Sequence, residues 1–382
     1  MLLPLSEDDF YTVNDPNIAW VRGITAGVRD DATGESVCVG TLEEQTSKAY
    51  ENLEKVLARS GHTLNNVVKM IYYIDSAAVK SFNQAIGVRA ELFGIDQLPA
   101  VTAVAVHSLL EKGALVKIEA VADRGGKKIV HYPDRRNDWK LPYKPCWDGG
   151  NVLWAAGLVA RSYDNLGSPL WPSDILGQYE AIYKRAETML GQAGLEFSDV
   201  VSLVDYIVPE GYHNYQQTHA IRRKYFGDQF PSSTTVLVDK LLADDALVEI
   251  DMFAVRHGDR MDLYPSSLSE SMLPSGVRKG DLVFVGGQVA TDSCGKDALT
   301  QVRQCLTQIR SVVQSAGGTI SDIARIVVYI SEDGYPAYQG ILEEIKRYFI
   351  RGAPSVTCIG VNNLSDPHLC VEMNAVADLR VK

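Results

Sequence analysis

The sequence contains no apolar run of bilayer length, and its first ten residues, MLLPLSEDDF, lack the basic region of a signal peptide. The first absence argues against a membrane-spanning helix, and the second argues against a secretory leader. We therefore expect a cytoplasmic protein that makes no membrane contact. The 46% hydrophobic and 22% charged fractions are those of soluble globular proteins.

Sequence patterns for metal and redox sites are also missing. The six cysteines fall at irregular spacings without a CxxC pair, and the seven histidines form no HExxH or comparable set. Buried free thiols are the expected state of such cysteines in a reducing compartment. We expect neither a metal ion nor another cofactor.

The chain has fewer positively than negatively charged side chains. The chain has 37 Lys and Arg residues against 48 Asp and Glu residues, a formal net charge of −11. This balance argues against general nucleic-acid binding and gives no long-range attraction to an anionic substrate. An acidic substrate would therefore need a local cationic contact.

What the sequence has is a threefold internal repeat. Residues 98–123, 230–255 and 353–378 each begin at or next to a proline, continue as a Thr-containing strand, and after a short connection end in a Val/Leu-rich strand. We interpret each stretch as a β-hairpin opened by proline, where the missing N–H has little effect. The second strand carries one polar residue before its apolar end, which is Lys117, Glu249 or Glu372.

Two further series repeat in the same order. A strand ends at Gly23, Gly157 or Gly287, and a later amphipathic helix ends at Gly61, Gly194 or Gly317, where a left-handed C-terminal cap is expected. A strand and a second helix follow in each copy. We predict three α+β domains at residues 1–128, 138–257 and 270–382, each a mixed sheet with two helices on one face.

This order of motifs resembles the RidA/YjgF family, and the resemblance covers nearly the whole chain three times. Members are usually single domains with a chorismate mutase-like fold that form trimers, with one ligand cleft between each pair of neighbours. The resemblance therefore implies an intrachain pseudo-trimer with three non-identical clefts. Further association of such pseudo-trimers stays open.

The resemblance also implies an activity. Members typically hydrolyse enamines and imines of 2-amino acids to 2-oxo acids and ammonia without a cofactor, and a related group deaminates 2-aminomuconate. We expect a hydrolytic deaminase and favour a 2-aminomuconate-type dicarboxylate, a step in the catabolism of aromatic compounds. A non-catalytic ligand-binding or chaperone-like module is an alternative. A ring amidase like cyanuric acid hydrolase ranks last, because no matching Ser/Lys set repeats.

The catalytic residues that the resemblance implies are only partly retained. The family's carboxylate-binding arginine falls on Val101, Ser233 and Val356, so every copy lacks it. The water-positioning glutamate is kept as Glu249 and Glu372, our predicted catalytic residues.

Arg22 stands at a family position that faces the cleft from the neighbouring subunit. We hypothesise that it replaces the missing arginine and shares a cleft with Glu249 or Glu372. The predicted substrate-binding residues are Arg22, Gly23, Lys117, Tyr143, Gly157, His219, Ser233, Gly287, Thr357 and Cys358.

Several of these residues also have a plain structural interpretation. Cys358 fits a packed thiol, since no motif places a histidine beside it. His219 and Lys117 fit exposed positions on a helix and a strand. Trp20 and Trp154 recur at one position and are expected in the core.

Overall fold

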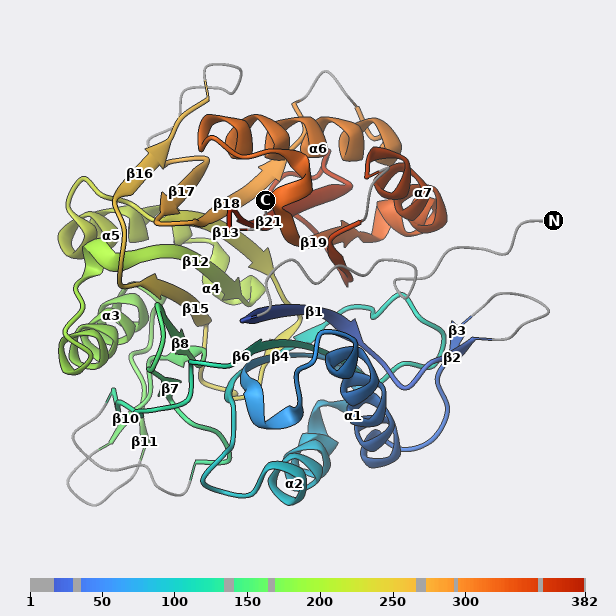
Figure 1. Cartoon of the computed structure of the whole chain (residues 1–382), viewed down its shortest axis with the longest axis horizontal. Helices are drawn as coiled ribbons and strands as arrows, with labels where there is room; N and C mark the ends of the chain where they lie inside the picture. The colour runs from blue at the N-terminus through green and yellow to red at the C-terminus, as the bar shows by residue number, and fades with distance from the viewer. Residues whose placement is uncertain are drawn as a thin grey trace.

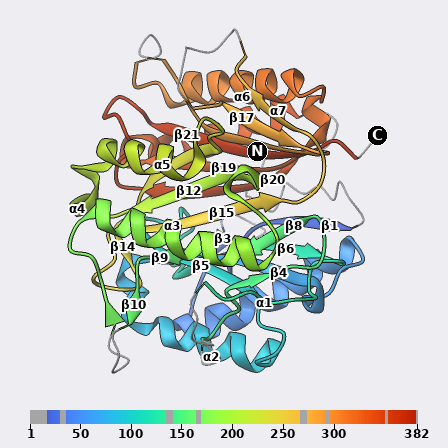
Figure 2. The same cartoon turned by 90° about the vertical axis from the view of Figure 1, so that its left-hand side faces the viewer.

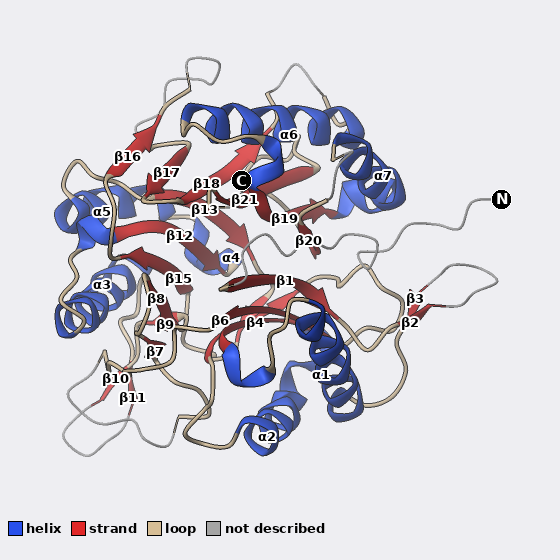
Figure 3. Ribbon diagram, viewed as in Figure 1, coloured by secondary structure: helices blue, strands red, loops and turns tan. Residues whose placement is uncertain are grey.

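The structure is a computed structural model that describes residues 17–29, 36–133, 141–163, 169–265, 273–291, 295–349 and 353–380. Each sequence repeat forms one large sheet, with the helices on the outside and the strands on the inside (Figures 1 and 3). In the view turned by 90°, α6 and α7 lie at one end, α1 and α2 at the other, and strands lie between them (Figure 2). The predicted α+β class with three tandem repeats is confirmed.

The first repeat has the strand order β1-β6-β4-β5-β14. Its elements are β1 (Ile18–Ile24), β2 (Val28–Arg29), β3 (Ser36–Val37), α1 (Leu42–Arg59), β4 (Val67–Asp75), α2 (Phe82–Phe93), β5 (Ala100–Val106) and β6 (Val116–Asp123). The edge strand β14 belongs to the second repeat, and it pairs antiparallel to β5 through Lys240 and Ala105. The first two repeats thus share a sheet edge.

The second repeat has the order β13-β12-β15-β8-β7, and β9 also pairs with β15. Its strands are β7 (Cys146–Trp147), β8 (Val152–Ala155), β9 (Leu158–Val159), β10 (Ser162–Tyr163), β11 (Pro169–Leu170), β12 (Val200–Ile207), β13 (Ser232–Leu237), β14 (Lys240–Leu241) and β15 (Val248–Val255). Its helices are α3 (Ile175–Gln192), α4 (Pro209–Tyr212) and α5 (Thr218–Phe226).

The third repeat has the order β16-β17-β18-β21-β19-β20. Its strands are β16 (Arg260–Leu263), β17 (Gly276–Lys279), β18 (Leu282–Val289), β19 (Ile323–Ser331), β20 (Ser355–Val361) and β21 (Val371–Asp378), and its helices are α6 (Ala298–Ser315) and α7 (Tyr338–Tyr348). Short 3₁₀ helices at Leu64–Asn66, Phe197–Asp199 and Ile320–Asp322 precede the equivalent strands β4, β12 and β19.

The predicted hairpins are wrong in their pairing. The two strands of each stretch do not pair with each other, because the preceding strand lies between them. In the second repeat β12 pairs parallel to β13 on one side and antiparallel to β15 on the other. The parallel pair arises because α5 carries the chain back across the sheet between β12 and β13.

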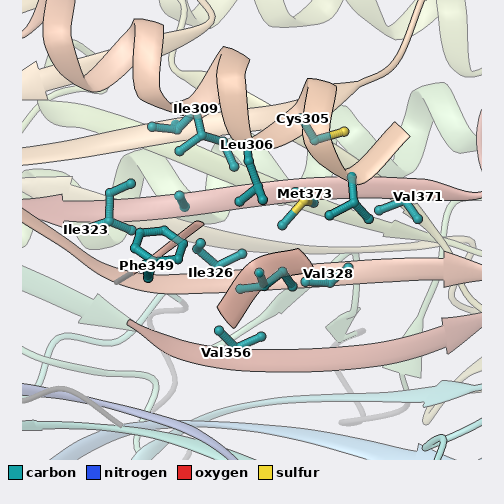
Figure 4. Close-up of a cluster of buried hydrophobic side chains, with 14 of the residues drawn as sticks. Cys305, Leu306, Ile309, Ile323, Ile326, Val328, Phe349, Val356, Val371 and Met373 are labelled. Carbon is teal, nitrogen blue, oxygen red and sulfur yellow. The ribbon is translucent and has the colours of Figure 1, made fainter. Parts of the chain in front are cut away.

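The outer face of each sheet packs against its two helices. In the third repeat Cys305, Leu306 and Ile309 of α6 cover Ile326 and Met373 on the strands beneath (Figure 4). The predicted glycine caps are confirmed, since the helices α1, α3 and α6 are followed by glycines with φ of +68°, +67° and +82°. The positions are Gly61, Gly194 and Gly317.

The inner faces of the three sheets pack on one another. Tyr73, Tyr206 and Tyr329, one from each repeat, lie in one buried cluster. Trp20 and Trp154 meet edge to face, with ring centroids 5.7 Å apart, which confirms their predicted place in the core. The three repeats therefore share a core. That this arrangement reproduces the family trimer stays a prediction.

Two buried ion pairs join the repeats. Lys69 Nζ of repeat 1 lies 2.6 Å from Asp251 Oδ1 of repeat 2, and both side chains are 0% exposed. Arg325 of repeat 3 donates two hydrogen bonds to Glu119 of repeat 1, at 2.7 and 3.0 Å. Such pairs are costly to break because the remaining charge is left buried.

The corresponding contact between repeats 2 and 3 is neutral. Ser202 occupies the position of the cation, and Asn374 occupies that of the acid. Asn374 Nδ2 donates instead to Thr234 Oγ1 at 3.2 Å. Cation and acid are thus absent together at this contact, which leaves no charge uncompensated.

Candidate functional site

Contacts between repeats define three junctions. The first joins repeats 1 and 2, where the N–H of Gly157 donates to the carbonyl of Val101 at 3.2 Å. The second joins repeats 2 and 3, where Gly286 lies against the backbone of Ser233. The third joins repeats 3 and 1, where the N–H of Gly23 donates to Thr357 Oγ1 at 2.8 Å.

At every junction a strand-end glycine makes room for one long side chain of its own repeat. A Cβ added to Gly157 would lie 2.0 Å from Glu249 Oε1, and one added to Gly287 would lie 2.0 Å from Glu372 Oε1. A Cβ on Gly23 would lie 2.7 Å from Cδ of Lys117. The repeated glycine is therefore needed for close approach of these side chains.

Both glutamates are buried, and the pKa of each is raised to about 8. Burial is the main cause for Glu249, whose Oε1 accepts a 3.4 Å hydrogen bond from the N–H of Ala103 across the first junction, a contact that lowers the pKa somewhat. For Glu372 burial is the cause. Among the residues that the structure describes, Glu372 makes no side-chain hydrogen bond or ion pair. Both carboxyl groups are thus largely protonated at neutral pH.

Repeat 2 also brings polar side chains to the second junction, through Ser233, whose backbone lies against Gly286. Arg222 Nη1 on α5 donates to Ser233 Oγ at 3.1 Å, and its Nη2 donates to Tyr215 at 2.7 Å and to the buried carboxylate of Asp205. Ser233 stands where the family arginine is missing. The guanidinium of Arg222 therefore reaches this position from the neighbouring helix.

Two other side chains border this network. Tyr215 shares a 2.6 Å hydrogen bond with Thr235, and the ring of His219 lies 6.3 Å from that of Tyr215. His219 is exposed on α5, and partial desolvation and the charge of Arg222 lower its pKa. It is therefore mainly neutral at neutral pH.

The third junction has a different chemistry. Lys117 replaces the glutamate, and its Nζ donates to the carbonyl of Cys358 at 3.0 Å and lies 3.8 Å from Glu111 Oε1. Arg22 is 8% exposed and donates to the carbonyl of Gly23 at 2.8 Å. Lys117 and Arg22 thus bring positive charge to this junction, with Glu111 as the acid beside Lys117.

The hypothesis that Arg22 shares a cleft with one of the two glutamates is wrong. Arg22 lies at the third junction, whereas Glu249 and Glu372 lie at the first and the second. The reason is the cyclic order of the repeats: the strand-end residues of repeat 1 face repeat 3, whose own glutamate points toward repeat 2. Cation and acid that were predicted together are separated.

The remaining predicted residues have mixed surroundings. The Cys358 thiol is fully buried among apolar side chains, and only its backbone carbonyl contacts Lys117. Thr357 bridges repeats, since its hydroxyl accepts from Gly23 and donates to Glu119 at 2.7 Å. Tyr143 is half-buried against the core of repeat 1.

No sequence signal marked Glu111, because this residue lies in the connection between β5 and β6 without a repeated counterpart. Tyr215 was likewise not predicted as a site residue. Asp205 offered a usable signal, because it is the only acid in strand β12. The other residues of this strand are apolar except Ser202 and Tyr206. Among the described residues no group of His, Cys, Asp and Glu side chains could hold a metal ion.

Comparison with known proteins gives consistent matches. A family model described as endoribonuclease L-PSP matches residues 20–124, 138–256 and 269–379. A RutC family protein of Pyrococcus horikoshii, PH0854, is 39% identical over 93 residues, which cover 24% of this chain and 70% of that protein. The corresponding protein of Pyrococcus abyssi is also 39% identical over 93 residues, covering 24% of this chain and 69% of that protein.

One solved structure extends the likeness in fold to most of the chain. A chorismatase structure matches 82% of this chain and 93% of its own, at 11% identity and a TM-score of 0.53, which concerns the fold alone. A member of the YjgF/YER057c/UK114 family from Mycobacterium tuberculosis is 28% identical over 31% of this chain and 99% of its own, with a TM-score of 0.28. None of the described helices is long and apolar enough to span a bilayer.

Proposed function

The chain belongs to the RidA/YjgF family, the family of the endoribonuclease L-PSP model, with three copies in tandem, and from this membership we propose that it is a hydrolytic deaminase. Its substrates are 2-imino acids and the enamines from which they form, and its products are 2-oxo acids and ammonia. The reaction takes place at the second junction, beside Glu372, and the first junction offers a second site beside Glu249. The natural substrate we favour is a 2-aminomuconate-type dicarboxylate.

One observation carries this proposal. The carboxyl group of Glu372 is buried, has a pKa of about 8, and makes no hydrogen bond to another described residue. A buried polar group without a partner is costly, so its retention is typical of a site where a ligand or water completes the interaction. A group with a pKa near neutrality can also both give and take a proton.

The chemistry needs only such a group and a bound water. The protonated carboxyl of Glu372 gives its proton to the imine nitrogen while water adds to the carbon, and the electron pair of the C=N π bond moves to nitrogen. The carboxylate so formed accepts one proton from the added water, which leaves a neutral carbinolamine, and the reprotonated carboxyl gives that proton to the amino nitrogen. The carbinolamine collapses as the carboxylate accepts the remaining hydroxyl proton. The C–N bond breaks, its electron pair leaves with ammonia, and a C=O bond forms.

Binding of the substrate carboxylate is assigned to the polar groups of repeat 2. Ser233 Oγ accepts from Arg222, so the hydroxyl proton of Ser233 remains for donation to a carboxylate oxygen. The guanidinium behind it is itself buried and polarises this hydroxyl. A hydroxyl supported by an arginine thus takes the place of the direct arginine contact.

The test is ammonia release above the spontaneous rate, from 2-iminopropionate generated by an amino-acid oxidase and from 2-aminomuconate. We expect Glu372→Gln to lower kcat by about 10²-fold or more, a usual effect of removing a general acid–base, with a further loss in the double variant with Glu249→Gln. Glu54→Gln, an exposed carboxyl on α1, is the control. Full activity of the double variant would exclude catalysis by these acids, and a wild type without ammonia release above the spontaneous rate would favour the non-catalytic module.

A ribonuclease assay belongs to the same test, because the family model carries an endoribonuclease description. The net charge of −11 disfavours binding to a phosphate backbone. We expect no RNA cleavage that depends on Glu372.

A further inference from the structure

Strand β13 gives the second junction a row of side chains that solvent reaches. Ser233, Thr235 and Leu237 alternate along this strand and are each partly exposed. The equivalent strands of the other repeats, β5 and β20, have every residue buried. Because alternate side chains of a strand point to the same face, the row runs as one surface from a hydroxyl at Ser233 to an apolar end at Leu237.

Two tyrosine rings of repeat 2 stand beside the apolar end of this row. Strand β12 ends at Ile207, which pairs with Leu237, and Tyr212 lies in the short helix α4 that follows. The ring of Tyr212 stacks on that of Tyr215, with centroids 5.9 Å apart and an angle of 17° between the planes. The Tyr215 hydroxyl is held to Thr235 at 2.6 Å. The two half-buried rings, which we call the tyrosine wall, therefore have a fixed position next to β13.

The tyrosine wall also reaches repeat 3 and the carboxyl of Glu372. The Tyr212 hydroxyl donates to the carbonyl of Ser365 at 3.4 Å, across the second junction. Burial, and then the charges of Glu372 and Asp366, raise the pKa of Tyr212, which places its phenol close to these carboxyl groups.

The position of Glu372 along β13 follows from the glycine beside it. A Cβ added to Gly287 would lie 2.0 Å from Glu372 Oε1 and 3.4 Å from Cγ2 of Thr234. The carboxyl therefore lies at the level of Thr234, past Ser233 in the direction of Leu237. The polar end of the row, the acid and the tyrosine wall thus follow one another along the strand.

We propose that the second junction selects substrates whose side chain is planar and unsaturated, an aryl group or a conjugated chain. The proposal rests on the proposed function, which places the substrate carboxylate at Ser233 and the reacting carbon beside Glu372. The rest of the substrate then extends toward Leu237 and lies against the ring of Tyr212. A flat π system gains from stacking on such a ring beyond the area that it buries, whereas a saturated chain gains from burial alone.

Tyr212 is the specificity-determining residue of this arrangement, since Tyr215 also accepts a hydrogen bond from Arg222 and cannot be changed without disturbing that network. Tyr335 offers a matched control. Gly334 and Tyr335 follow β19 as Gly211 and Tyr212 follow β12, but the Tyr335 ring lies against His107 of repeat 1.

Isothermal titration of the full chain with two carboxylates that are not turned over tests the proposal. Cinnamate is planar and conjugated, and 3-cyclohexylpropionate has the same number of carbon atoms but a saturated, puckered ring. The wild type should bind cinnamate about 5-fold or more tightly than 3-cyclohexylpropionate. Equal affinities, or no binding of cinnamate, would overturn the proposal.

The variants separate stacking from general apolar contact. Tyr212→Ala should weaken cinnamate binding about 10-fold, and Tyr212→Phe should keep it within about 2-fold because the ring remains. Tyr212→Leu keeps an apolar side chain, so it should reduce the preference for cinnamate over 3-cyclohexylpropionate to about 2-fold or less. Tyr335→Ala should change neither affinity; a loss equal to that in Tyr212→Ala would place the ligand elsewhere.

Kinetics extend the test to turnover. With imino acids generated by an amino-acid oxidase, Tyr212→Ala should lower kcat/KM for 2-imino-3-phenylpropionate about 10-fold more than for 2-iminopropionate, whose methyl group is too short to reach the wall. Cinnamate binding that depends on Tyr212 in a wild type that releases no ammonia would refute the proposed function and leave the tyrosine wall in place. Ammonia release without dependence on Tyr212 would refute the tyrosine wall alone.

Discussion

Replacing Glu372 by glutamine should make the stability of the protein less dependent on pH. The folded-state pKa of this carboxyl is about 8, against an ordinary value of 4.5, because burial disfavours its charged form. At 1.36 kcal/mol for each pKa unit, this difference corresponds to about 5 kcal/mol as an order of magnitude. Glutamine has a similar shape and stays neutral at every pH.

The sign follows from proton binding. Below pH 4.5 the carboxyl is protonated in both the folded and the unfolded chain, and its contribution to stability is fully present. Between pH 4.5 and 8 the unfolded chain releases the proton while the folded chain keeps it, so stability falls as pH rises and is lost through pH 8. Glu372→Gln should therefore gain about 3 kcal/mol over the wild type between pH 5.5 and pH 8.

Urea unfolding of the wild type and the variant at a series of pH values measures this difference. The two proteins are compared by the shift in their unfolding midpoints, because a protein of three repeats need not unfold in two states. Glu249 has the same folded-state pKa but is present in both proteins, so its contribution cancels. Glu54→Gln should give a difference that does not vary with pH. A constant difference for Glu372→Gln as well would show that the carboxyl ionises normally and would refute the reasoning.

Three further predictions concern the same junctions. The kcat for ammonia release should fall as pH rises through about 8, because Glu372 must be protonated to donate; a rate that rises across this range would contradict the assigned role. Gly287→Ala should lower kcat about 10-fold or more and stability by only about 1 kcal/mol, since the new Cβ displaces a movable carboxyl. The control Gly191→Ala, in helix α3 with open space around it, should leave kcat unchanged. Lys69→Met should lower the free energy of unfolding, measured in urea, by about 3–5 kcal/mol, and adding Asp251→Leu should restore most of that loss. A double variant as unstable as Lys69→Met would show that packing, not charge, is decisive.

The sequence predicted the repeats and their class because amphipathic periodicity, helix-ending glycines and proline-started strands are local signals. It predicted the wrong strand neighbours, because a short connection does not reveal that β12 lies between β13 and β15. It could not predict that β14 leaves its repeat to pair with β5, since two residues carry no pattern.

The site was predicted as residues but not as an assembly. Glu249 and Glu372 were predicted because they stand at the position of the family's water-positioning glutamate. The pairing of Arg22 with a glutamate failed, because the order of repeats along the chain does not say which face meets which neighbour. Arg222 reaches Ser233 through the fold of α5 over β13, which no spacing encodes.

The polar contacts between repeats make the three copies non-interchangeable. A ring built from three copies of repeat 2 would bury three Asp251 carboxylates opposite three Ser202 hydroxyls, and one built from repeat 3 would bury three Arg325 guanidiniums opposite Asn374. A ring of three copies of repeat 1 would pair each Lys69 with a Glu119 and cancel its charges, so repeats 2 and 3 are the copies that depend on the mixed ring. If the repeats were expressed as separate polypeptides, mixtures of all three should assemble in a single cyclic order, and swapping two repeats within the chain should prevent closure.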